Sequence, residues 1–284
     1  MHDPAPAGYG GEPSQPPGDN LFSRARDCLC ACDLDQKLKL AAELQTDWLA
    51  GRLESGEVEL ADVVEAGHPQ RPPLVHPRQL PRRSLATEEG RLALIHAVAH
   101  IEFNAINLAC DAVFRFQGMP QAYYADWIQV AAEEAVHFRL LQERLHAGGR
   151  EYGDFPAHNG LWDMARRTAH DPLIRMALVP RMLEARGLDV TPGMITRLQA
   201  VGDRQTVEVL SRILRDEVGH VEMGSRWFRY LCERQGVAPE KTYFELLETF
   251  LNGEIRGPLH REARRQAGFS DSELDRLERL SKRV

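Results

Sequence analysis

The sequence of 284 residues contains no apolar run approaching the ~18–20 residues that a helix needs to cross a bilayer. Its N-terminus also lacks the apolar core of a signal peptide, and the proline and glycine there predict a disordered lead over residues 1–20. An excess of positive charge is missing too: the net charge is −7, which argues against a dedicated nucleic-acid binder. We therefore expect a cytoplasmic protein that binds neither membranes nor nucleic acids.

Cysteine is scarce, and the five cysteines do not form a recognisable zinc site. Cys28, Cys30 and Cys32 lack the two-residue spacing of a zinc knuckle and have no second half, so their role stays open. Cys110 and Cys232 fall within apolar helical patterns, where we expect core thiols. An odd number of cysteines without an export signal favours a reducing compartment.

Alternation of apolar and polar residues with period two is also absent over any useful length, so the sequence predicts an all-α protein. Residues 21–54 predict one or two amphipathic helices, and five prolines within residues 66–83 predict an extended connector. Further helices are predicted near residues 88–116, 121–147, 161–187 with an interruption around Asp171–Pro172, 195–200, 203–235, 240–252 and 271–282. After the lead, this gives an N-terminal helical segment with connector (21–83), a four-helix bundle (84–252) and a C-terminal helical extension (253–284).

Two similar motifs stand 83 residues apart, EEAVHF at residues 133–138 and DEVGHV at residues 216–221. A single Glu-x-x-His arises easily by chance in a chain with this much glutamate. Two further copies can be set aside, because Glu65 lies in a segment broken by glycine and proline and Glu143 faces away from Glu134 on the same helix. In the two remaining motifs, glutamate and histidine three residues apart can reach one point.

Glu102 is the first anomaly, because it lies in the middle of the apolar face of its predicted helix. An ionised carboxylate buried there is costly unless it is paired or binds a cation. The matching position in the second half is Glu184, 82 residues further on and again on a mostly apolar face. Each half would then offer one glutamate from one helix and Glu-x-x-His from the next.

This pattern matches a di-metal carboxylate bundle, in which two helices each give one glutamate and two give Glu-x-x-His. Oxygen-rich ligation with one imidazole per metal favours two Fe ions, or Mn with Fe, over structural zinc. The alternative is a set of satisfied buried ion pairs, in which Arg181 neutralises Glu184. We expect Glu133 and Asp216 each to contact an imidazole as supporting groups, together with Arg181. The predicted ligands are Glu102, Glu134, His137, Glu184, Glu217 and His220.

Pro180 lies four residues before Glu184 and cannot donate the helical hydrogen bond to the Met176 carbonyl. The sequence therefore predicts a kink or π-type irregularity near residues 176–180, and a regular helix around Glu102. Such an asymmetry would make the Glu184 side the more open one and the expected route for oxygen or substrate.

Two other polar features are weaker candidates. His96, His100, Asn107 and Asp111 form a polar stripe on the helix of Glu102, directed away from it, where packing against the N-terminal segment is favoured over metal ligation. The loop YGDFPAHNGLW at residues 152–162 reads as a structured loop, with a lid or substrate wall as the alternative.

Several segments resemble the ferritin-like proteins classed as domain of unknown function 455, over roughly residues 80–270. They are HAVAHIEFNAINLACD, DWIQVAAEEAVHFRLL, YGDFPAHNGLW, LVPRMLEARGLDVTP, DEVGHVEMGSRWF and RGPLHREARRQAGF. The resemblance implies a ferritin-like four-helix bundle with a di-metal centre and gives ligand roles to the six residues above. More distantly, this architecture is similar to di-iron tRNA hydroxylases, phenylacetyl-CoA epoxidase subunits and rubrerythrins.

Two classes of function follow as expectations. The first is a di-iron or Mn/Fe oxidoreductase that activates O₂ or peroxide to oxidise or hydroxylate an organic substrate. Its partners would be a small-molecule substrate, an electron-donor protein and a second copy of the chain in a homodimer. The second is a non-enzymatic ferritin-like metal-binding protein or a scaffold subunit of an oxygenase complex.

Overall fold

The computed structural model describes residues 20–282 except 60, 82 and 254. The predicted N-terminal lead lies, up to residue 19, outside the described residues. The all-α prediction is confirmed: in the described part of the chain the backbone forms helices, with isolated bridges such as Leu74 to Ala157 in place of strands. In chain order the elements are α1 (Leu21–Cys30), α2 (Leu34–Leu49), η2 (Pro77–Gln79), α3 (Glu88–Arg115), α4 (Gln121–Ala147), α5 (Gly160–Arg167), α6 (Pro172–Leu178), η3 (Val179–Glu184), α7 (Ala185–Ala200), α8 (Arg204–Gln235), α9 (Pro239–Leu251), α10 (Arg261–Gln266) and α11 (Asp271–Ser281).

The centre of the molecule is a bundle of α3, α4, α8 and the composite helix α6–η3–α7. Helices α3 and α4 pack together along their length, α8 packs against α6, η3 and α7, and α4 contacts α8 and joins the two pairs. Asp126 near the start of α4 binds Arg226 near the end of α8, whereas Arg144 near the end of α4 binds Gln205. These contacts show that α4 and α8 run antiparallel.

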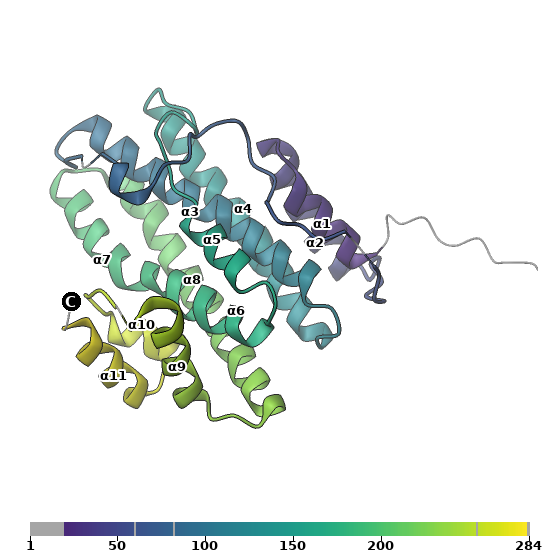
Figure 1. The fold of residues 1–284 in the computed structure, drawn as a ribbon. Coiled ribbons are helices and arrows are strands. Elements are labelled where there is room, and N and C mark those ends of the chain that lie inside the picture. Colours follow the sequence, from purple (N-terminus) through teal and green to yellow (C-terminus); the bar gives the residue numbers. More distant parts are fainter. Residues whose placement is uncertain (1–19, 60, 82, 254, 283–284) are drawn as a thin grey trace, which may run out of the picture.

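The remaining helices cover the bundle on two sides (Figure 1). Helices α1 and α2 pack on α3 and α4, while α9 and α10 pack on α6, α7 and α8. The segment between α2 and α3 is extended apart from the short turn η2, as its prolines predict.

Helix α3 owes its length to good end signals and an apolar body. Thr87 caps it by accepting a hydrogen bond from the Gly90 amide, Glu88 and Glu89 occupy the first turn, and Arg115 the last. Among the described helices it alone is long and apolar enough to cross a membrane, but 78% of its most apolar window is buried inside the protein. This burial is typical of a core helix.

The predicted π-type irregularity before Glu184 is present, but it lies at residues 179–184 rather than near 176–180. Residues Val179–Glu184 form a π-helical turn, closed by a hydrogen bond from the Ala185 amide to the Pro180 carbonyl five residues earlier. Helix α3, which carries Glu102, is a continuous α-helix as predicted.

Two details of the helix prediction are wrong. The predicted break before residue 195 is absent, because α7 continues through Pro192. A proline inside a helix removes one backbone hydrogen bond. Here α7 also packs against α8, and this packing holds the helix together. The short helix α10 was not predicted, because its six residues, REARRQ, carry almost no apolar periodicity.

Candidate metal centre

Three long helices direct four of the predicted ligands toward one point. Glu102 comes from α3, Glu134 and His137 from α4, and Glu217 from α8. Each of these four residues offers one ligand atom, and the four atoms lie within 4.8 Å of one another. The structure therefore brings residues 115 positions apart in the chain to one point, as the sequence pattern predicts.

Glu134 is the central residue of this cluster. One carboxylate oxygen, Oε2, lies 3.2 Å from His137 Nδ1, and the other, Oε1, lies 3.0 Å from His220 Nδ1. Glu102 Oε2 is 3.3 Å from the same His137 nitrogen, and Glu217 Oε1 is 3.8 Å from the His220 nitrogen. One carboxylate thus connects the imidazoles of the two halves, whose ring centroids are 5.9 Å apart.

The outer nitrogens of the two imidazoles are held by acids of the opposite helix. His137 Nε2 lies 3.0 Å from Asp216 on α8, and His220 Nε2 lies 2.7 Å from Glu133 on α4. The two contacts expected for Glu133 and Asp216 are therefore present, but in a crossed arrangement. The sequence signal was the acid directly before each Glu-x-x-His; the crossing follows from the antiparallel contact of α4 with α8.

Burial and mutual repulsion strongly affect the carboxylates. Burial, followed by the charge of Glu134, raises the pKa of both Glu102 and Glu217. Burial also raises the pKa of Glu184 to about 8, with further contributions from the charges of Glu217 and Glu134. Four carboxylates in one buried region can ionise together only if cations balance them.

The imidazoles respond in the opposite direction. Burial alone would lower the pKa of His137, but its close contacts with the carboxylates of Glu102 and Glu134 raise it to about 11. Burial likewise opposes the charge on His220, and its contacts with Glu133 and Glu134 outweigh burial and raise its pKa. Both nitrogens of each ring face carboxylates, so in the metal-free cluster the two imidazoles keep their protons and balance part of the negative charge.

Glu184 is at the edge of the cluster rather than inside it. Its Oε2 atom is buried and accepts no hydrogen bond, as is true of Glu102 Oε2. The two sides of the cluster differ in exposure: Glu184 and Glu217 are half-buried, whereas Glu102 and Glu134 are buried. This difference has the direction expected from the irregular turn at Pro180.

The prediction that Arg181 supports the centre is wrong. Its guanidinium binds Glu273 at 2.8 Å and Ser225 at 3.2 Å, and it stacks over the rings of Phe228, Tyr243 and Phe269. A projection at 100° per residue placed Arg181 beside Glu184. The π-helical turn between them has more residues per turn and directs Arg181 toward α11 instead.

The polar stripe on the other face of α3 has structural partners. Asn107 accepts a hydrogen bond from the buried Lys37 of α2, in agreement with packing against the N-terminal segment. His100 and His96 instead contact the loop after α4, through the Tyr152 hydroxyl and the Gly153 amide. Burial lowers the pKa of both histidines to about 4.

The cysteines of the Cys-x-Cys-x-Cys pattern are divided between the core and the surface, since Cys28 is buried while Cys30 and Cys32 are exposed.

Comparison with known proteins agrees with the family named from the sequence. The family described as "Protein of unknown function (DUF455)" matches residues 30–275. The chain belongs to this family. It is also 48% identical over 217 residues to an uncharacterized protein of Haemophilus influenzae strain Rd, a match that covers 74% of this chain and 75% of the relative. No solved structure matches the chain.

Proposed function

We propose that this DUF455 protein is a ferritin-like di-metal oxidoreductase that uses O₂ or peroxide to oxidise or hydroxylate an organic substrate. The observation that carries the proposal is the position of Glu134, whose two oxygens face the imidazoles of both halves. Glu102 and Glu217 complete a buried group of four convergent donors with His137. Two helix pairs that each supply glutamate and Glu-x-x-His are the ligand pattern of di-iron and di-manganese carboxylate bundles.

The charges of the cluster fit two divalent cations. Four ionised glutamates carry four negative charges, and two neutral imidazoles add none, so two divalent ions would neutralise the set. The buried oxygens of Glu102 and Glu184 that accept no hydrogen bond are free to bind them. Oxygen-rich ligation with one imidazole per ion favours iron or manganese over structural zinc.

The chain's own groups would each have a distinct role. Nδ1 of His137 and of His220 faces the cluster and would bind metal, while Asp216 and Glu133 hold the proton on each Nε2. Glu134, Glu102, Glu184 and Glu217 would supply the carboxylate ligands that hold the ions. Bound iron or manganese would supply the redox chemistry with O₂ or peroxide, and an electron-donor protein would supply reducing equivalents.

A non-enzymatic metal-binding or scaffold subunit is the second candidate. It is favoured by four cavities of the described part of the chain, whose walls contain none of the six cluster residues. Such a protein would bind metal in the same cluster and show no reaction with O₂.

The proposal is tested by anaerobic reconstitution with Fe(II) or Mn(II), followed by metal analysis and exposure to O₂. We expect close to two metal ions per chain, and a marked loss of metal in Glu134→Gln or Glu217→Gln, because both remove a buried ligand charge. The reconstituted iron protein should consume O₂ in the presence of a reductant, with a change in its optical spectrum.

Glu143→Gln is the matched control, because Glu143 begins another Glu-x-x-His on α4 but is exposed. This variant should retain the metal content of the wild type. Wild-type protein that binds no transition metal after reconstitution would refute the proposal. Metal binding without any reaction toward O₂ or peroxide would decide for the scaffold.

A further inference from the structure

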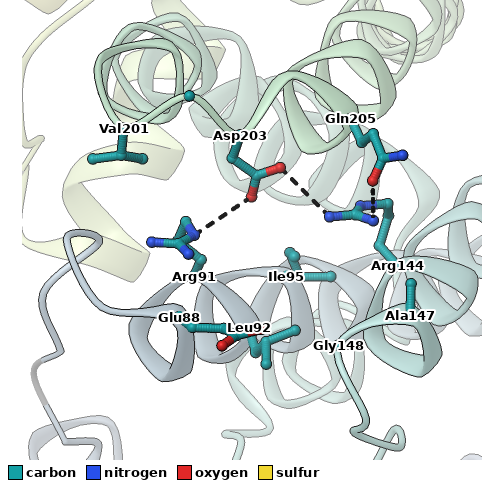
Figure 2. A pocket seen from close by; sticks show the side chains of 11 residues that line it. Glu88, Arg91, Leu92, Ile95, Arg144, Ala147, Gly148, Val201, Asp203 and Gln205 are labelled. Atoms are coloured by element: carbon teal, nitrogen blue, oxygen red, sulfur yellow. Dashed lines mark hydrogen bonds and ion pairs between the residues drawn. The ribbon is translucent and has the colours of Figure 1, made fainter.

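A cavity of about 320 Å³ opens at the end of the bundle where α3 and α8 begin and α4 and α7 end. Figure 2 shows Arg91 of α3 and Arg144 of α4 on either side of Asp203, with Ile95 on the floor between them. The volume is at the lower end of the ~300–1,000 Å³ range of small-molecule sites. None of these residues belongs to the metal cluster.

The two arginines are only distantly paired with an acid, although Arg144 also donates to Gln205 Oε1 at 2.7 Å and to Thr206 Oγ1 at 3.4 Å. Asp203 lies 3.8 Å from Arg91 and 3.5 Å from Arg144, because its carboxylate mainly caps α8 through the Thr206 amide and hydroxyl at 3.1 and 2.9 Å. Arg91 otherwise donates to the carbonyls of Leu85 and Ala86 through Nη1, which leaves Nη2 without a hydrogen-bond partner among the described residues. A guanidinium in this state can bind a further carboxylate.

The cavity and the metal cluster lie on the same inward faces of the helices. Ile95 precedes Glu102 by seven residues and Arg144 follows His137 by seven, which is two helical turns or about 10 Å along the axis. Between these two levels each helix carries a buried apolar residue four positions from a cluster residue: Val98, Leu141 and Ile213.

We propose that this cavity binds an organic carboxylate with an apolar body and is the approach by which such a substrate reaches the cluster. The carboxylate group binds between Arg91 and Arg144, and the apolar body points toward the layer of Val98, Leu141 and Ile213. This inference rests on the proposed function, because it names the substrate class of that centre. The cavity itself can be tested without any metal.

The test is a calorimetric titration of metal-free protein with octanoate and with octanamide, which has the same length but no charge. We expect octanoate to bind at least about tenfold more tightly, because charge-assisted hydrogen bonds to a guanidinium are stronger than neutral ones. Arg91→Gln and Arg144→Gln should each weaken octanoate binding by about tenfold and leave octanamide binding nearly unchanged. Metal-free protein is used so that octanoate cannot bind a metal ion at the cluster.

Arg139→Gln is the matched control, because Arg139 is also on α4 but exposed and outside the cavity wall. It should bind octanoate like the wild type. In protein loaded with Co(II), octanoate should also change the visible absorption of the metal, and this change should be lost in Arg144→Gln. Equal binding of octanoate and octanamide, or octanoate binding that neither arginine variant weakens, would overturn the inference.

The metal content of the same samples separates the two proposals. Protein that binds Co(II) but not octanoate would overturn the inference and leave the proposed metal centre intact. Protein that binds octanoate through the two arginines but no Co(II) would refute the proposed function and the role of the cavity as an approach to the cluster, and would leave the carboxylate site itself intact.

Discussion

At the scale of single residues, Glu134 explains why two distant halves of the chain form one cluster. Its side chain is 1% exposed, and its two oxygens face His137 and His220. Burial opposes its ionisation, but hydrogen bonds from Glu102 and both imidazoles hold its pKa well below the usual range. An ionised carboxylate is therefore fixed at the centre before any metal binds.

The crossed acids make a prediction at this scale. Glu133→Gln and Asp216→Asn should each lower the affinity for Mn(II) or Fe(II) by ~10–100-fold, the usual effect of losing a partner of a ligand imidazole. In the wild type, each carboxylate keeps the imidazole proton on Nε2, so that Nδ1 is free to bind metal. Each substitution removes that carboxylate. Affinities can be measured by competition with a chromophoric chelator.

Because Glu133 and Asp216 are both about one-third exposed, their loss should change little else in the protein. Glu222→Gln serves as the control, since Glu222 is also on α8 and half-buried, but is paired with Arg226 rather than an imidazole. Unchanged metal affinity in both acid variants would show that the crossed contacts do not support the ligands.

At the scale of elements, the π-helical turn η3 depends on a glycine in the helix that faces it. A Cβ atom on Gly224 of α8 would overlap the ring of Pro180. The chain thus accommodates a proline in a core helix by removing the side chain opposite to it. Gly224 lies four residues after His220, so this contact also fixes the distance between the turn and the cluster.

Gly224→Ala should therefore destabilise the protein by about 1–3 kcal/mol, the usual cost of overpacking a core. The effect is opposite to helix propensity, which favours alanine over glycine by about 1 kcal/mol. Urea unfolding of the metal-free protein measures the change. The double variant Gly224→Ala/Pro180→Ala should recover much of the loss, because it removes the ring that the new methyl group meets.

Gly219→Ala is the control for this comparison. Gly219 is on the same helix as Gly224, and a Cβ atom on it would meet no neighbouring atom within 4 Å. It should be neutral or stabilising. A Gly224→Ala protein as stable as Gly219→Ala would show that η3 adjusts freely and does not depend on the glycine.

The elements also show how far the sequence could be interpreted. Helical periodicity, the repeat of Glu-x-x-His and the position of Pro180 predicted the all-α bundle, the convergence of Glu102 with the two motifs, and the π-type turn. The helices and the turn follow from local patterns, whereas the convergence was inferred from a repeated motif that matches the ligand set of a di-metal bundle. The partner of Arg181, Glu273, lies 92 residues away, and no local rule connects the two.

The cavity at the end of the bundle was not predicted for a related reason. Its two arginines and Asp203 come from three elements, and each arginine looks like an ordinary surface residue on its own helix. Their proximity depends on how the α7–α8 turn is placed over the start of α3. That placement is set by packing between the two helix pairs, which the sequence of one chain does not reveal.

At the scale of the whole molecule, the fold buries the glutamates of the cluster without enough positive side chains to balance their charge. Several buried arginines are paired with carboxylates, as Arg264 is with Asp189 and Arg175 with Asp111. The cluster instead has four glutamates for two histidines, and its pKa values shift so that protons fill the deficit. Metal-free protein should therefore depend on pH in a way that metal-bound protein does not.

The sign of this dependence follows from two groups. Burial raises the pKa of Glu184 from its ordinary value of 4.5 to about 8, so between these pH values the folded protein keeps a proton that the unfolded chain has lost. His137, with a pKa of about 11, keeps a proton that the unfolded chain releases above 6.5. Both contributions stabilise the folded state at low pH and are lost as pH rises toward the folded pKa values.

Between pH 6.5 and 8, the free energy of unfolding of metal-free protein should therefore fall, by roughly 1 kcal/mol per pH unit for each proton retained. His96 and His100 do not interfere, because their lowered pKa values affect stability only below pH 6.5.

A divalent ion reverses the trend, because it binds ionised glutamate and neutral imidazole. The stabilisation by Zn(II), a redox-inert probe, should therefore grow with pH. Urea unfolding at several pH values measures both slopes, and Glu184→Gln should flatten the metal-free one. Metal-free protein that becomes more stable across this range would show that the cluster does not retain protons in place of metal.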